Sequence, residues 1–164
     1  MTRMTRRSVL IGAAASVAAM PVISLAPARA NENHDILMLN KDPDDARARM
    51  VFYPKIIKIA MGDSVTFVPT DKGHNCVSTP GMVPEGAAGW KSKFNEQITV
   101  TPDRHGVYGY HCVPHKAMGM VGLLLVEGEG MLDNLEAAKA FRQVGLSRRV
   151  WAGIWTQAEA DGLI

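Results

Sequence analysis

Short runs of apolar, β-branched and aromatic residues recur along most of the chain, and Gly, Pro, Asn or Asp residues separate them. In the run at residues 64–68, polar and apolar side chains alternate, as they do in a strand with one buried face. Similar runs occupy residues 35–40, 50–54, 56–59, 97–101, 106–111 and 120–126. Many short strands with turn residues between them predict an all-β fold, an antiparallel β-sandwich with its loops gathered at the two ends.

Two segments depart from this pattern. Residues 69–93 are rich in Gly and Pro and predict a long irregular connection, which in a small domain usually serves a function. After residue 131 the apolar spacing becomes helical, with Asp133 or Asn134 as the expected first cap and Ser147 as the second. The apolar face of the second helix consists of Val150, Trp151, Ile154 and Trp155. We expect this face to pack on the sandwich; a partner surface is the alternative.

The first 30 residues have the pattern of an export signal. Arg6 and Arg7 precede an apolar run, and residues 28–30 (Ala-Arg-Ala) offer a small-x-small cleavage site. A retained membrane anchor is the alternative, but Pro21 and Pro27 interrupt the run. We therefore expect residues 1–30 to be a cleaved twin-arginine-type signal peptide and the mature protein to be periplasmic. The mature chain then divides into a sandwich at residues 31–130 and helices at residues 131–164.

Removal of the leader changes the charge of the chain. The leader contains four of the 18 basic residues and no acidic one, so 14 basic and 16 acidic residues remain, a formal net charge of −2. The basic character of the precursor therefore gives no support to nucleic-acid binding. Cleavage leaves 134 of the 164 residues, enough for one domain with a workable core. No membrane attachment is expected after cleavage.

A cluster of potential metal ligands lies between the last two predicted strands. Cys112, His115 and Met120 place a thiol, an imidazole and a thioether within nine residues, and His74 in the irregular connection offers a second imidazole. This soft and borderline donor set suits copper, and less specifically zinc. Spacing alone leaves Met118 open as the thioether in place of Met120.

Several motifs together resemble the pseudoazurins, blue copper proteins of the cupredoxin family. They are PTDKGHN at residues 69–75, KSK at 91–93, GVYG at 106–109 and CVPHKAMGMVG at 112–122. The likeness extends over about residues 39–139, and the helical tail also matches. It implies a cupredoxin-like antiparallel Greek-key β-sandwich with a two-helix C-terminal extension.

The resemblance also implies one type 1 copper ion per chain. It makes His74, Cys112 and His115 the strong ligands and Met120, rather than Met118, the weak axial ligand that tunes the redox potential. Asn75 is expected to tie the two ligand loops together by hydrogen bonds. The other histidines are not expected to be ligands. His111 should point away from the metal and be exposed, and His105 should be exposed as well. Nothing in the sequence around His34 indicates a role for it.

Cys76 departs from the family, which has valine at this position. It can be a small buried thiol, as free cysteines usually are, or it can form a disulfide with Cys112 and abolish the copper site. We expect the free thiol, since a disulfide would leave the other ligands without a purpose.

His115 is the expected exit for electrons, because it lies in a loop beside Met118. The resemblance implies an apolar patch around it with Met50 and Met118. A ring of basic residues would surround the patch: Lys41, Lys72, Lys91, Lys93 and, less securely, Lys116. Such a ring would steer acidic partners, which in this family are cytochromes c and the nitrite or nitrous-oxide reductases of denitrification.

These features predict a mononuclear copper electron carrier and no enzyme. No nucleophile–base pair or phosphate loop is visible, and four protein ligands leave the metal no open position for a substrate. A periplasmic copper chaperone or storage protein is the alternative, which the ten methionines suggest, and a disulfide-bonded binding module without metal is a second.

Overall fold

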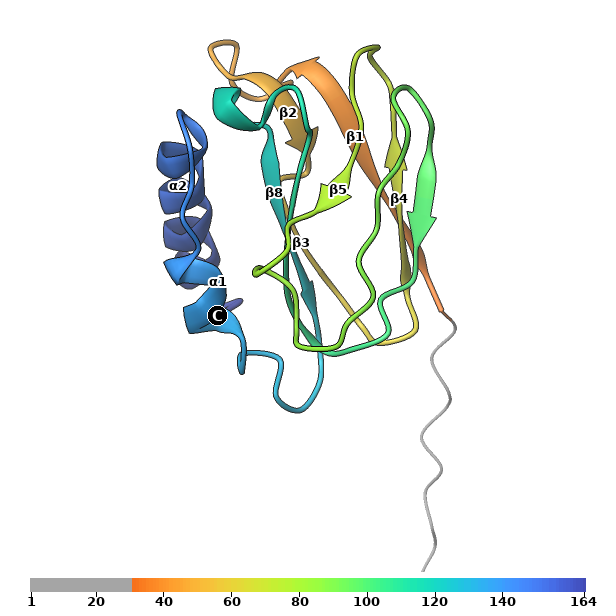
Figure 1. Ribbon diagram of the computed structural model, residues 1–164, viewed down its shortest axis with the longest axis vertical. Helices are drawn as coiled ribbons and strands as arrows, with labels where there is room; N and C mark the ends of the chain where they lie inside the picture. The colour runs from red at the N-terminus through yellow and green to blue at the C-terminus, as the bar shows by residue number, and fades with distance from the viewer. Residues whose placement is uncertain (1–30) are drawn as a thin grey trace, which may run out of the picture.

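The computed structural model describes residues 31–164, so the expected leader lies outside the described residues. Eight strands, two α-helices and one 3-10 turn follow one another in residues 31–164 (Figure 1). The strands are β1 (Asn33–Lys41), β2 (Arg49–Tyr53), β3 (Ile56–Ile59), β4 (Ser64–Val68), β5 (Val77–Ser78), β6 (Ile98–Val100), β7 (Gly106–His111) and β8 (Val121–Val126). The helical elements are η1 (Lys116–Met118), α1 (Leu135–Ala140) and α2 (Ser147–Ala160).

The strands form two four-stranded sheets, in the orders β2-β1-β4-β6 and β3-β8-β7-β5. The predicted sandwich is confirmed, and seven of the eight strands lie where the apolar runs indicated them; the short β5 lies in the connection that was expected to be irregular. The sheets are mixed, because β1 pairs with β4 and β3 with β8 in parallel, whereas the other pairs are antiparallel. Parallel neighbours cannot be joined by a tight hairpin, and here other strands lie between them in the chain: β2 and β3 between β1 and β4, and β4 to β7 between β3 and β8.

Aromatic side chains fill the space between the sheets. Phe52 and Phe67 from the first sheet meet Tyr110 of the second, with ring centroids 4.9 and 5.0 Å from that of Tyr110. Trp90, from the irregular connection, stacks on Phe67 at 5.8 Å. This packing fixes the end of β7, which Cys112 directly follows, and the connection after β4, which contains His74.

The two helices cover the outer face of the sheet that contains β8, as Figure 1 shows on the left of the molecule. Trp151, Ile154 and Ala158 are buried there in one cluster with Leu123 and Leu125 of β8. The expected packing of the second helix on the sandwich is therefore confirmed. Burying one face of α2 supplies most of the stability of a helix of this length.

The capping residues of the helices behave differently from the expectation. Asn134 is the N-cap of α1 but its side chain does not cap: its amide accepts the Val107 N–H at 3.0 Å and donates to the Val107 carbonyl at 2.8 Å. Ser147 is the first residue of α2 and not its cap, which is Leu146. The Ser147 hydroxyl donates instead to the Val144 carbonyl.

Candidate metal centre

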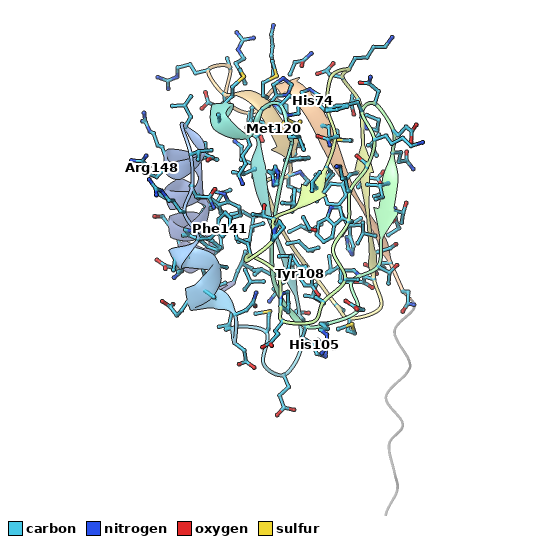
Figure 2. The ribbon with its side chains drawn as sticks, viewed as in Figure 1. His74, His105, Tyr108, Met120, Phe141 and Arg148 are labelled. Carbon is cyan, nitrogen blue, oxygen red and sulfur yellow. The ribbon has the colours of Figure 1, made fainter. Side chains whose placement is uncertain are left out.

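Two chain segments bring three of the expected ligands together at one end of the sandwich. His74 lies in the connection after β4, Cys112 follows β7, and His115 immediately precedes η1. The ligand atoms of these residues all lie within 4.8 Å of one another. Figure 2 shows His74 and Met120 at the same end of the molecule, opposite His105.

The distances show that the donor atoms face a common point. The Nδ1 atoms of His74 and His115 are 3.2 Å apart. The Cys112 sulfur lies 3.5 Å from Nδ1 of His115 and 3.9 Å from Nδ1 of His74. One thiol and two imidazole nitrogens in this arrangement fit a copper ion, for which such a trigonal set is diagnostic.

Asn40 at the end of β1 sets the protonation state of His74. Its Oδ1 lies 3.0 Å from Nε2 of His74, and an amide oxygen can only accept, so Nε2 carries the proton. The lone pair is therefore on Nδ1, the atom that faces Cys112 and His115. Burial, and then the charge of His115, lower the pKa of His74, which keeps the ring in the neutral form that binds metals. The sequence did not indicate Asn40.

Met120 is held close to the other candidates by the backbone. Its N–H donates to the His115 carbonyl at 3.1 Å and its carbonyl accepts from the Cys112 N–H at 3.0 Å. Its side chain is fully buried, whereas Met118 on η1 is 47% exposed. Gly119 separates the two methionines with a φ of +99°, and a side chain there would clash with Val150. Burial therefore favours Met120 over Met118 as the axial candidate.

Hydrogen bonds from Asn75 join the two ligand-bearing loops, as expected. Its Oδ1 accepts the Val113 N–H at 2.9 Å, and its Nδ2 donates to the Ser92 carbonyl at 3.4 Å. Burial raises the pKa of the Cys112 thiol, while hydrogen bonds from the backbone N–H groups of Asn75 and His115 oppose this shift. Both donors favour the thiolate, but burial is the larger effect and the pKa of Cys112 is raised overall.

Cys76 and Cys112 are both buried free thiols, so the disulfide alternative is wrong. The indole N–H of Trp90 donates to the Cys76 sulfur at 3.2 Å, which satisfies the thiol within the aromatic core. Burial raises the pKa of Cys76 well above its usual value, and the side chain therefore acts as a small neutral core residue.

The other histidines lie outside this cluster. His111 points to Thr79, whose hydroxyl lies 2.8 Å from its Nδ1, and it is half-buried rather than exposed. Burial, and then the charge of Lys116, lower its pKa to about 4. His105 contacts the Glu127 carbonyl at the opposite end, and Nε2 of His34 lies 3.3 Å from a carboxylate oxygen of Asp63.

The residues expected at the docking surface differ in exposure. His115 and Met50 are partly exposed, and Val113 and Met118, which lie within three residues of His115 in sequence, are about half exposed. Lys41, Lys72, Lys91 and Lys93 are all exposed. Lys116 differs from the expectation: it is partly buried, with its Nζ 5.3 Å from the centre of the Phe141 ring.

Comparison with known proteins gives the family. The family model for copper-binding proteins of the plastocyanin/azurin family matches residues 40–127. The chain is 40% identical over 136 residues to a pseudoazurin of Methylorubrum extorquens, a match that covers 83% of this chain and 88% of the relative. It is 43% identical over 124 residues to a pseudoazurin of Paracoccus pantotrophus, with 76% of this chain and 82% of the relative covered.

The solved structures agree. The refined crystal structure of pseudoazurin from Methylobacterium extorquens AM1 superposes with a TM-score of 0.70 at 40% identity, covering 76% of this chain and 98% of that chain. The family match, the fold and the copper-type donor set all lead to one assignment. The chain belongs to the copper-binding plastocyanin/azurin family, the cupredoxins, and within it to the pseudoazurins, which are copper electron carriers.

Proposed function

We propose that this protein is a periplasmic type 1 copper electron carrier in which His74, Cys112, His115 and Met120 hold the ion. The observation that carries the proposal is the convergence of two imidazole Nδ1 atoms and the Cys112 sulfur within 4.8 Å. The hydrogen bond from His74 to Asn40 supports it, because it turns an unprotonated nitrogen toward that point. A copper ion bound there would supply a one-electron redox centre.

The residues around the site hold the donors in place. Asn75 bonds across the two loops, and the Cys112–Met120 and His115–Met120 backbone bonds close the ligand loop. Donors that are fixed in this way change position little when the charge of the centre changes, so little rearrangement accompanies electron transfer. Four protein ligands leave no position for a substrate, which favours a carrier and not an enzyme.

His115 is the proposed route for the electron. It is the partly exposed member of the set, while His74, Cys112 and Met120 are buried. We propose that partners dock on the apolar patch of Met50 and Met118. The proposed basic ring consists of the exposed Lys41, Lys72, Lys91 and Lys93, without Lys116. The candidate partners are cytochromes c and the nitrite or nitrous-oxide reductases of denitrification.

The proposed location rests on the leader pattern at residues 1–30. Among residues 31–164, no helix is both long and apolar enough to cross a membrane. The buried position of three candidate ligands also speaks against a copper chaperone, which needs exposed and labile ligands to release its cargo.

The visible spectrum of the copper-loaded protein, together with a reversible redox titration, tests the function. We expect an intense charge-transfer band that disappears on reduction and returns on oxidation. Cys112→Ser should abolish the band, and Cys76→Val, the matched control at the other buried thiol, should retain it. A colourless protein that holds only Cu(I), or a band that survives Cys112→Ser, would refute the proposal.

A further inference from the structure

A groove of about 750 Å³ opens between the loop before β2 and the N-terminal end of α2. Its lining includes Arg49, Met118, Leu146 and Arg149. Met118 also belongs to the apolar patch around His115, so the groove continues the surface through which the copper site is reached. Figure 1 shows η1, the turn that carries Met118, beside the N-terminal end of α2.

The charges of this groove are only partly neutralised. Lys55 pairs with Asp42 at 2.6 Å, and Arg47 lies 3.8 Å from Asp45. Arg49 and Arg149 are exposed, and neither forms an ion pair with any residue between 31 and 164. The groove therefore has two free guanidinium groups, which suit carboxylates well.

The N-terminal end of α2 strengthens this preference for anions. Arg148 and Arg149 occupy the first turn of the helix, where no acidic residue is present. The helix dipole favours negative charge at this end and disfavours cations. A carboxylate placed here would therefore interact favourably with Arg149, with Arg49 and with the helix end.

Leu146 adds an apolar contact to the groove. Its side chain is 60% exposed, while its backbone is fixed by a hydrogen bond from its N–H to the Ala117 carbonyl at 2.8 Å. An exposed leucine on a rigid backbone offers apolar area that a partner can bury at little entropic cost. Leu146 and Met118 together extend the apolar patch from His115 toward α2.

The shape of the surface favours an extended chain segment. A second hollow of about 670 Å³ continues along α2 and shares five lining residues with the first: Asp45, Ala48, Lys55, Arg149 and Val150. It runs toward Asp161, so the basic end of the whole groove is the one next to Met118. A depression that follows α2 and has cations at one end suits a peptide segment that presents its carboxylates near η1.

We propose that Arg49, Arg149 and Leu146 bind an extended, carboxylate-bearing loop of a redox partner, as a second anchor beside the His115 patch. The proposal rests on the proposed electron-carrier function and goes beyond its lysine ring, none of whose members lines the groove. Two anchors on either side of η1 fix the orientation of the partner, so that its redox centre is held near His115.

Stopped-flow oxidation of the reduced, copper-loaded protein tests this proposal, with a c-type cytochrome of acidic surface as one oxidant and hexacyanoferrate(III) as the other. Arg149→Glu should slow the reaction with the cytochrome about 10-fold at low ionic strength, and high salt should remove most of the difference. Arg104→Glu, the matched control with the same change in net charge, lies near the opposite end beside His105 and should slow it about 2-fold or less. Leu146→Ser should slow the reaction about 3-fold without changing its salt dependence.

The two oxidants separate the possible failures. If hexacyanoferrate(III) does not oxidise the reduced protein, the electron-carrier function itself is refuted. If it does, but Arg149→Glu slows the cytochrome no more than Arg104→Glu does, the second anchor is refuted and the carrier function stands. An unchanged visible spectrum in each variant shows that the copper site is intact.

Discussion

At the scale of single residues, the centre depends on atoms that orient the ligands as much as on the ligands. His74 offers Nδ1 only because Asn40 accepts the proton of Nε2, and the backbone of Asn75 and His115 partly offsets the burial that raises the pKa of Cys112. Met120 and Met118 differ by two positions in the chain but face different surroundings, one the buried core and the other solvent. Two predictions belong to this scale.

Met120→Leu should keep copper bound but raise its redox potential, because the loss of the thioether weakens the support for the oxidised ion. The exchange nearly conserves volume in a fully buried position, so the cost in folding stability should stay below about 1.5 kcal/mol. Met118→Leu is the control, and cyclic voltammetry is the measurement. A shift in Met118→Leu and none in Met120→Leu would reverse the assignment of the axial ligand.

Asn40→Leu should lower the affinity for copper about 10- to 100-fold, because His74 loses the acceptor that fixes its tautomer and ring orientation. Asn40→Asp retains an acceptor oxygen at the same place, so its affinity for copper should be much closer to that of the original protein. Competition with a chelator of known affinity measures the effect. Equal affinities in the Leu and Asp variants would show that this hydrogen bond does not matter for copper binding.

At the scale of elements, polar side chains from loops and helix ends join neighbouring elements to one another. The side-chain amide of Asn134 bonds both backbone groups of Val107, as a neighbouring strand would, and so joins the start of α1 to β7. The ion pair between Lys55 and the buried Asp42 joins the loop after β1 to the connection between β2 and β3. Each gives a prediction about stability.

Asn134→Ala should lower the free energy of unfolding by about 1–3 kcal/mol, because the N–H and C=O of the buried Val107 lose their partners. Asp133→Ala changes the neighbouring, exposed residue and should have a much smaller effect. Urea denaturation of both variants measures the difference. A similar loss in both would mean that the amide acts only through the helix terminus.

Asp42→Asn should destabilise the protein at neutral pH by about 1.5–3 kcal/mol, the range for hydrogen bonds to charged groups. Burial acts to raise the pKa of Asp42, but hydrogen bonds from Lys55 and the backbone outweigh it and the pKa is lowered. The contribution is therefore present above the unfolded-state value of about 3.9 and is lost as the pH falls through the lower folded-state value. Unfolding measured from pH 7 to pH 3 should show the two proteins converging at the acidic end; a constant difference would contradict this.

At the scale of the whole molecule, the candidate copper site lies at one end of the sandwich, and the proposed docking surface would make the charge distribution directional. The exposed lysines of the proposed ring and the arginines of the groove lie on loops, at the ends of β1 and β2, and at the N-terminal end of α2, although residues 31–164 have a formal net charge of −2. Such asymmetry steers encounter without requiring an overall positive charge.

The double variant Lys91→Glu and Lys93→Glu should slow the reaction with an acidic partner at low salt and leave the visible spectrum unchanged. Lys58→Glu with Arg104→Glu makes the same change in net charge away from the site and should slow it far less. The salt dependence of the second-order rate constant measures the effect. A rate that is indifferent to both charge and salt would rule out steering by this ring.

The sequence by itself determined what depends on neighbours along the chain. Alternating apolar positions marked the strands, and the spacing of Cys112, His115 and Met120 marked the ligand loop, because both are local periodicities. It also indicated the buried free thiol at Cys76 and the packing face of α2. The strands, the free thiol and the packing of α2 are confirmed, and the ligand assignment stays a prediction.

The tertiary structure decided what depends on partners far away in the chain. The parallel pairing of β1 with β4 and of β3 with β8, the role of Asn40, the bonds from Asn134 to β7 and the half-buried His111 each join segments that are distant in sequence. The sequence shows only an asparagine, whether its side chain caps a helix, orients a histidine or hydrogen-bonds a strand edge as a neighbouring strand would. Only the position of the other segment in space selects among these roles, because hydrogen bonds and burial act between neighbours in space.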